Sequence, residues 1–243
     1  MRLLTYNVHG CRGTDGVLSP ERIAEVIAYY EPDIVGLQEL DVARARSGGI
    51  DQAVAIAAAL KMTAHFHPAL HVMEEQYGDA ILTALPSRLI KGAALPGLAW
   101  YRSLEPRGAL WASLETPQGT LQIINTHFGL LPQERRAQAD ALLGPAWLGH
   151  PACCDPVILM GDFNTVPGSG IYRALARRLM DAQSLAPQRA RATFPASAPL
   201  LRIDHVFLSA GLDVIAADVA RLPGARQASD HLPLIVDIAP SSF

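Results

Sequence analysis

The sequence predicts an α/β (α+β) protein in which helices cover mixed β-sheets. Segments with helical patterning alternate with short apolar runs rich in β-branched residues, and several consecutive short runs indicate antiparallel hairpins. A hydrophobic fraction of 50% allows a sizeable core and excludes global disorder. No internal repeat or linker is evident, so we expect residues 1–243 to form a single domain.

The chain begins with two strand–helix units. In the first helix Ser19 is the expected N-cap, Pro20 occupies the first turn and Pro32 ends the helix. The second helix is rich in alanine. In chain order, the expected elements are strand Leu3–Val8, helix Pro20–Tyr30, strand Asp33–Leu40 and helix Gln52–Leu60.

From Thr63 onward the apolar runs become shorter, which is typical of hairpins. The turn Pro117–Gly119 joins the last two of these runs. The expected strands are Ala64–Pro68, Tyr77–Leu85, Leu89–Leu95, Ala109–Leu114 and Leu121–Thr126.

The rest of the chain alternates between helices and strands again. Arg135 and Gln138 lie one turn apart on the same face of the next helix. Ala182–Leu201 is rich in Ala, Pro and Arg and is expected to be a long loop, which in a compact domain is usually functional. The expected elements are helix Pro132–Leu148, strand Val157–Gly161, helix Gly170–Arg178, and strands Ile203–Leu208, Asp213–Ala217 and Leu234–Ile238.

Charge and cysteine usage narrow the functional class. The formal charge of −3 and the scattered arginines argue against a strongly basic nucleic-acid binder. Cys11, Cys153 and Cys154 form an odd set, and adjacent cysteines rarely bridge, so we expect reduced thiols in a reducing compartment.

Neither the N-terminal segment nor the longest apolar stretch has the pattern of a membrane-targeting or membrane-spanning segment. The strand that follows Met1 leaves no room for a secretory leader, and the apolar stretch that begins at Ala80 is interrupted by Pro86, Arg88 and Lys91. We therefore expect a cytoplasmic protein with no transmembrane segment and no obligate protein partner.

Polar side chains sit where predicted strands meet loops, and strand ends on a rigid sheet are common positions for catalytic groups. The motifs TYNVHG, LQEL, NTHFGL, GDFN, RIDH and SDH carry them. The residues are Asn7, Glu39, His127, Asp162, Asn164, Asp204, Asp230 and His231. A single Asn, Asp or His after a strand is most often a turn former or helix cap, but this ordered set is an improbable coincidence.

These residue types suit hydrolysis of a phosphate ester at a hard cation. Glu39, Asn7 and Asp230 offer the oxygen ligands that Mg²⁺ prefers. Asp162 and Asn164, two apart on an extended segment, would face the same way and could hold one water.

Histidines complete this set. Asp204 and His231 would form a carboxylate–imidazole pair, and His127 could donate to a phosphoryl oxygen. His9 and His205 neighbour candidate residues, but we expect them to face the opposite way on a strand and place both outside the site.

The order of motifs resembles the endonuclease/exonuclease/phosphatase superfamily, and the resemblance extends from TYNVHG to SDHLPL. Segments between the motifs also match, among them SGGIDQ, YGDAILTALP, EPRGAL, ERRAQADALL, PGSGIYRAL and TFP. The resemblance implies a DNase-I-like four-layer sandwich, two mixed β-sheets packed face to face with helices outside. It also implies a hydrolase that depends on Mg²⁺ or Mn²⁺.

The resemblance further implies roles for single residues. Glu39 would be the main metal ligand, with Asn7 and Asp230 beside it. Asp162, assisted by Asn164, would orient or deprotonate the attacking water. Asp204 would polarise His231, and His231 with His127 would stabilise the transition state, while the choice between Asp162 and His231 as general base stays open.

Departures from the family pattern indicate which group of the superfamily the sequence resembles. Glu39 is followed by Leu40-Asp41 rather than the Thr-Lys of exonuclease-III-type nucleases, and the Trp-Cys-Asp-Arg segment of inositol-polyphosphate phosphatases is missing. NTHFGL is closer to neutral sphingomyelinase-like and general phosphodiesterase members. Asp79 stands where relatives often have Asn, and we expect Asp79 and Arg107 to contact substrate.

The sequence therefore favours a metal-dependent phosphodiesterase acting on phospholipid-type or small diesters by in-line attack of water. A nuclease that cleaves DNA or RNA is the alternative, because a basic stripe could still assemble in three dimensions. A binding module that lost its chemistry is the third reading, and the complete set of carboxylates and histidines disfavours it.

Overall fold

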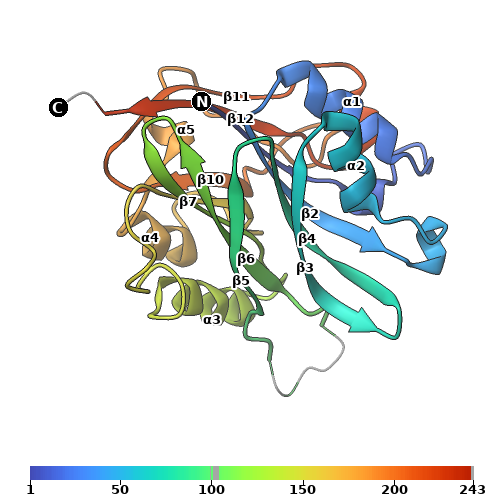
Figure 1. Ribbon diagram of the computed structural model, residues 1–243, viewed down its shortest axis with the longest axis horizontal. Coiled ribbons are helices and arrows are strands. Elements are labelled where there is room, and N and C mark those ends of the chain that lie inside the picture. Colours follow the sequence, from blue (N-terminus) through green and yellow to red (C-terminus); the bar gives the residue numbers. More distant parts are fainter. Residues whose placement is uncertain (99, 101–103, 242–243) are drawn as a thin grey trace.

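Two six-stranded β-sheets pack face to face at the centre of the molecule (Figure 1). The computed structural model describes residues 1–98, 100 and 104–241. The first sheet has the order β11-β12-β1-β2-β4-β3, with strands Leu212–Val219, Leu234–Pro240, Arg2–Asn7, Ile34–Val42, Glu75–Thr83 and Thr63–Val72. The second has the order β5-β6-β7-β8-β10-β9, with strands Ser87–Ala94, Gly108–Thr116, Gly119–His127, Val157–Asp162, Asp204–Leu208 and Met180–Asp181.

Helices cover the outer face of each sheet. Helices α1 (Pro20–Tyr30) and α2 (Gln52–Leu60) lie on the first sheet, and α3 (Pro132–Leu143) and α4 (Gly170–Ala176) lie on the second (Figure 1). The short helical elements are α5 (Ala182–Leu185), α6 (Ala225–Ala228), η1 (His9–Cys11) and η2 (Ala45–Ser47). The expected four-layer sandwich is confirmed.

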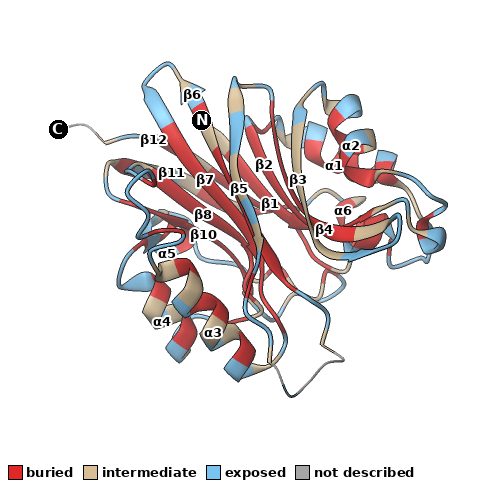
Figure 2. Ribbon diagram, turned by 60° about the horizontal axis from the view of Figure 1, so that its bottom comes forward, coloured by how far each residue is buried: buried red, intermediate tan, exposed pale blue. Residues whose placement is uncertain are grey.

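The core follows these layers. One cluster of buried side chains fills the space between the sheets and extends to α1 and α2, with Leu4, Leu37 and Met160 among its members. A second lies between the second sheet and the helices α3 and α4, around Trp111 and Leu142. Figure 2 shows the central strands buried and the outward faces of the helices exposed. Two buried clusters on either side of the second sheet make that sheet a rigid support.

Strand directions bring several strand ends to one edge of the sandwich. β1 runs parallel to β2, and β7 runs parallel to β8. A hydrogen bond between Asn7 and Asp162, the last residues of β1 and β8, brings the ends of the two pairs together. β12 is antiparallel to β1 and β10 is antiparallel to β8, so β12 and β10 begin where β1 and β8 end. The polar motifs of the sequence therefore converge at this edge.

Some expected element boundaries are wrong. The third helix ends at Leu143 rather than residue 148, because Pro145 disfavours helical geometry at Gly144, which is extended. The expected loop 182–201 begins with α5, and β9 and α6 are too short for a sequence pattern to reveal. None of the helices in the described ranges has the length and apolar character needed to cross a membrane.

Candidate active site

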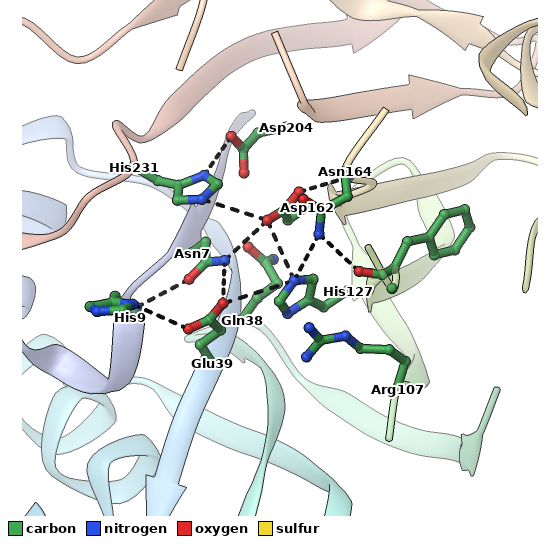
Figure 3. A network of polar contacts seen from close by, with 12 residues as sticks. Asn7, His9, Gln38, Glu39, Arg107, His127, Asp162, Asn164, Asp204 and His231 are labelled. Atoms are coloured by element: carbon green, nitrogen blue, oxygen red, sulfur yellow. Dashed lines mark hydrogen bonds and ion pairs between the residues drawn. The ribbon is translucent and has the colours of Figure 1, made fainter. Parts of the chain in front are cut away.

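The candidate residues occupy the strand ends at this edge (Figure 3). Asn7, His127 and Asp162 are the last residues of β1, β7 and β8, and Asp204 is the first residue of β10. Asp230 and His231 lie in the segment that leads into β12. The register pairs Asp162 with both His127 and Asp204 on the neighbouring strands. Sheet geometry thus places these side chains side by side.

Glu39 reaches the site through a bulge in β2. The pairing of β2 with β4 shifts register between Leu37 and Leu40, and Glu39 has a φ of 64°. Asn125 stabilises this irregularity, because its side-chain amide donates to the carbonyl of Leu37 at 2.8 Å. The Glu39 side chain remains 22% exposed, which leaves its carboxylate accessible from the cleft.

Asn7 links two carboxylates. Its Nδ2 donates to Glu39 Oε1 at 3.0 Å and to Asp162 Oδ2 at 3.1 Å, while its Oδ1 accepts from the backbone N–H of His9 at 3.1 Å. The amide oxygen keeps a second lone pair that could face a cation. Burial by itself would raise the pKa of Glu39, but the hydrogen bonds from His9 and Asn7 hold it below its ordinary value.

Asp162 and Asn164 form a tight turn at the end of β8. The backbone N–H of Asn164 donates to Asp162 Oδ1 at 2.8 Å, and Asn164 has a φ of 47°. Its side-chain amide donates to the carbonyl of Phe128 at 2.9 Å, and the guanidinium of Arg135 donates to its backbone carbonyl. Burial and the nearby charge of Asp204 raise the pKa of Asp162. The turn holds both side chains in one orientation.

Asp204 and His231 form the expected carboxylate–imidazole pair. Nδ1 of His231 lies 2.9 Å from Asp204 Oδ2, and its Nε2 lies 3.7 Å from Asp162 Oδ2. Burial would lower the pKa of His231, but the charges of Asp204 and Asp162 outweigh it and raise the pKa to about 10. The buried hydroxyl of Thr193 also donates to Asp204 Oδ2, and the Phe194 ring packs 4.7 Å from the His231 ring between centroids.

His127 is held in the neutral form. Burial and the charge of Arg107 lower its pKa to about 3. Its Nε2 lies 3.5 Å from Asp162 Oδ2 and 3.2 Å from Asn164 Nδ2. The contact with the Asn164 amide favours a tautomer with the proton on Nδ1, so donation to a substrate from Nε2 requires the other tautomer.

The donor chemistry of this edge fits a hard divalent cation. Glu39 and Asp230 offer partly exposed carboxylates on the same side of the cleft, next to the amide oxygen of Asn7. Asp162, Asp204 and His231 form a second, buried group whose donor atoms lie within 4.8 Å of one another. The first group has the oxygen-rich composition that Mg²⁺ and Mn²⁺ bind, whereas in the second the raised pKa of His231 and its pairing with Asp204 keep the imidazole protonated and occupied.

The placement of His9 corrects an expectation. β1 ends at Asn7, and His9 lies in the turn η1 with a φ of 49°, so the alternation rule for a strand does not apply. The ring lines the cleft, 3.5 Å from Glu39 Oε2 through Nδ1. On a continuing strand the spacing of two residues would also have put His9 on the side of Asn7, so the sequence offered a signal that the expectation did not use. His205, by contrast, is buried outside the cleft and contacts the carbonyl of Thr165 at 2.8 Å.

The two expected substrate contacts differ in position. Arg107 lines the cleft, 7% exposed, and its guanidinium donates to Glu105 at 2.6 Å. Asp79 is only 4% exposed, and burial raises its pKa to about 8 although the charge of Arg107 opposes this shift. Direct contact of Asp79 with substrate therefore stays a prediction.

The cleft above these residues has a volume of about 570 Å³. Both cationic and apolar side chains contribute to its walls, namely Arg12, Arg46, Arg107, Leu18, Leu130, Phe194 and Ile203. Sequence reasoning did not find most of these wall residues, because they come from loops without a distinctive local pattern.

Two curated proteins are similar to this chain in sequence. Exodeoxyribonuclease III of Haemophilus influenzae is 27% identical over 177 residues, which cover 69% of this chain and 58% of that protein. The uncharacterized protein YbhP of Escherichia coli (strain K12) is 26% identical over 174 residues, covering 68% of this chain and 64% of that protein. The chain thus aligns with about three-fifths of the length of these curated relatives.

A solved structure shares the fold over nearly the whole chain. The endonuclease/exonuclease/phosphatase from Beutenbergia cavernae DSM 12333 superposes with a TM-score of 0.81 and 24% identity, covering 99% of this chain and 72% of that one. The sequence profile described as the Endonuclease/Exonuclease/phosphatase family matches residues 4–231. With the strand-end motifs, the four-layer sandwich and this match in agreement, the chain belongs to the endonuclease/exonuclease/phosphatase family.

Proposed function

We propose that the protein is a divalent-metal-dependent hydrolase of phosphate esters, with phospholipid-type or other small phosphodiesters as its preferred substrates. The convergence of Asn7, Glu39, Asp162 and the Asp204–His231 pair in one cleft carries this proposal. These groups come from both sheets, and such a set of carboxylates and imidazole in one cleft is the arrangement expected of a hydrolytic site.

The residues divide the work of an in-line displacement. Asp162 and Asn164 orient the attacking water, and Asp162 takes its proton as the water oxygen bonds to phosphorus. His231, oriented by Asp204, donates a hydrogen bond to the phosphoryl group as negative charge develops there. The bond from phosphorus to the leaving alkoxide breaks on the opposite side. Mg²⁺ or Mn²⁺ bound near Glu39 would neutralise phosphoryl charge and stabilise the leaving oxygen.

The cleft supports a small diester as the substrate. A volume of about 570 Å³ accommodates a headgroup or small ester. The apolar walls suit an acyl or aryl substituent. The guanidinium groups of Arg107 and Arg46 are paired with Glu105 and Asp41, and their remaining N–H groups could donate to an anionic phosphate. The net charge of −3 also argues against a nucleic-acid substrate, because binding many phosphates usually requires an excess of Lys and Arg.

A substrate panel tests this proposal. The protein is incubated with bis-p-nitrophenyl phosphate, sphingomyelin, plasmid DNA and single-stranded RNA, each with Mg²⁺, with Mn²⁺ and with chelator, and Asp162→Asn serves as the inactive control. We expect metal-dependent hydrolysis of the small diester or the lipid. Rapid plasmid nicking with no turnover of either would overturn the substrate preference.

A nuclease is the second candidate. The 27% identity to a protein named exodeoxyribonuclease III favours it, as does the position of Arg12 at the cleft wall. Degradation of RNA or DNA in the same panel would select this function. Lack of turnover on every substrate, with no cation binding by calorimetry, would instead favour a binding module.

A further inference from the structure

His9 lies beside the carboxylate of Glu39 in the cleft (Figure 3), and the carboxylate of Asp230 is also close to its ring. Its Nδ1 is 3.5 Å from Glu39 Oε2 and 3.8 Å from Asp230 Oδ1, and its side chain is 49% exposed. The backbone N–H of His9 donates to Asn7 Oδ1 at 3.1 Å, which ties the turn to the end of β1. The imidazole therefore stands among the oxygen donors that fit a cation.

The separations between these atoms suit shared coordination. Ligand atoms about 2.1–2.2 Å from an octahedral cation lie roughly 3 Å apart when adjacent and roughly 4.3 Å apart when opposite. The distances from His9 Nδ1 to the Glu39 and Asp230 oxygens are 3.5 and 3.8 Å, longer than the adjacent spacing, so a cation bound here would draw the three side chains closer together. A cation held by either carboxylate would have this nitrogen as a neighbour.

We propose that His9 supplies a nitrogen ligand to the cation bound by Glu39 and Asp230, and thereby shifts the preference of the site from Mg²⁺ toward transition-metal ions such as Mn²⁺ and Co²⁺. Imidazole binds divalent transition metals well, whereas Mg²⁺ favours oxygen ligands and retained waters. This inference rests on the proposed metal dependence. It adds that the imidazole of His9 determines which metal the site prefers.

A conservative variant isolates this role. The φ of 49° at His9 belongs to the left-handed region, which Asn tolerates better than most residues, so His9→Asn preserves the turn. The half-exposed ring also makes little contribution to the core. His71→Asn on the exposed end of β3 is the matched control, because it removes an imidazole that does not line the cleft.

Calorimetric titration of the complete chain with Co²⁺ and with Mg²⁺ measures the preference. We expect His9→Asn to weaken Co²⁺ binding by about tenfold or more, since loss of a partner of a bound metal typically has that effect. Mg²⁺ affinity should change much less, and His71→Asn should match the wild type. Equal loss of affinity for both ions, or no change for either, would overturn the proposal.

Pulsed electron paramagnetic resonance of the Mn²⁺-loaded protein detects the bond itself. We expect a ¹⁴N coupling from a directly bound imidazole in the wild type and in His71→Asn, and its absence in His9→Asn. Mn²⁺ binding without this coupling, or a coupling that survives in His9→Asn, would refute the role of His9 and leave the proposed function standing. Absence of any cation binding would refute both.

Discussion

Asn7 Nδ2 donates a hydrogen bond to Asp162 Oδ2 at 3.1 Å, although the two residues belong to different sheets. The same nitrogen donates to Glu39 Oε1 at 3.0 Å. One amide therefore fixes the separation between the carboxylate assigned to the cation and the carboxylate assigned to the water. Because these two carboxylates have distinct tasks, their substitution should have distinct consequences.

Asp162→Asn should lower kcat by about 10³-fold, within the range expected for loss of a general base. Cation affinity should stay close to that of the wild type, because Glu39 and Asp230 are unchanged. Hydrolysis of bis-p-nitrophenyl phosphate and calorimetric titration with Mn²⁺ measure the two effects. A circular dichroism melt provides the control for folding.

Glu39→Gln should weaken Mn²⁺ binding, because it removes the charge of the expected main ligand. Raising the Mn²⁺ concentration should partly restore turnover, which it should not do for Asp162→Asn. The measurement is the rate as a function of Mn²⁺ for both variants. If the two variants respond alike across the titration, the division of labour between these carboxylates is wrong.

Thr193→Val should reduce kcat by roughly tenfold with little change in KM, because Asp204 loses a charge-assisted hydrogen bond and the imidazole of His231 loses its fixed orientation. Thr193→Ser keeps the hydroxyl and should restore most of the rate. His231→Ala should give the lowest kcat of the series, about 10²–10³-fold below the wild type, because it removes a preorganised hydrogen-bond donor. Equal rates for the Ser and Val variants would show that packing, rather than the hydroxyl, matters at this position.

Stability should fall as the pH is lowered from about 6.5 to 4, because of His205. Burial lowers the pKa of His205 to about 4 from the ordinary histidine value of 6.5. Between these values the unfolded chain binds a proton that the folded chain does not, so acid favours unfolding. The contribution is roughly 2 kcal/mol at pH 5, and below pH 4 it no longer grows.

Urea denaturation of the wild type and of His205→Gln between pH 5 and 7.5 measures this contribution. Gln can still donate to the carbonyl of Thr165, but it does not titrate. The variant should therefore show a smaller decrease in unfolding free energy toward acid pH, whatever its stability at neutral pH. Identical slopes for the two proteins would exclude His205 as the source.

Local sequence signals were sufficient for most strands and helices. The helix Gln52–Leu60 has the predicted bounds, and Ser19 and Pro20 mark the start of α1 as expected. Capping residues and apolar runs act within a few neighbours, so they can be read without the fold. The end of α3 was missed because helical pattern continues past Gly144-Pro145, although backbone sterics stop the helix there.

The sequence predicted which residues belong to the site better than it predicted how they are arranged. The order of motifs pointed to Asp162, Asn164, Asp204 and His231, and the structure brings them within contact of one another. The interpretation of His9 failed because two residues after Asn7 a strand would present His9 on the same face as Asn7, not the opposite one, and because β1 in fact ends at Asn7. Thr193 belongs to the TFP segment that resembles the family, but the segment gave no indication that the hydroxyl donates to Asp204.

By itself, the sequence determined which side chains stand at strand ends and which chemistry they can perform, because these properties depend on residue type and on short-range backbone preferences. Only the tertiary structure decided how these ends meet. The parallel and antiparallel registers align six strand ends at one edge, the bulge at Glu39 turns its carboxylate into the cleft, and the turn after β1 brings His9 to the same place. Such relationships join residues as far apart as Asn7 and Asp162, and they arise from long-range sheet pairing that no local stretch of sequence encodes.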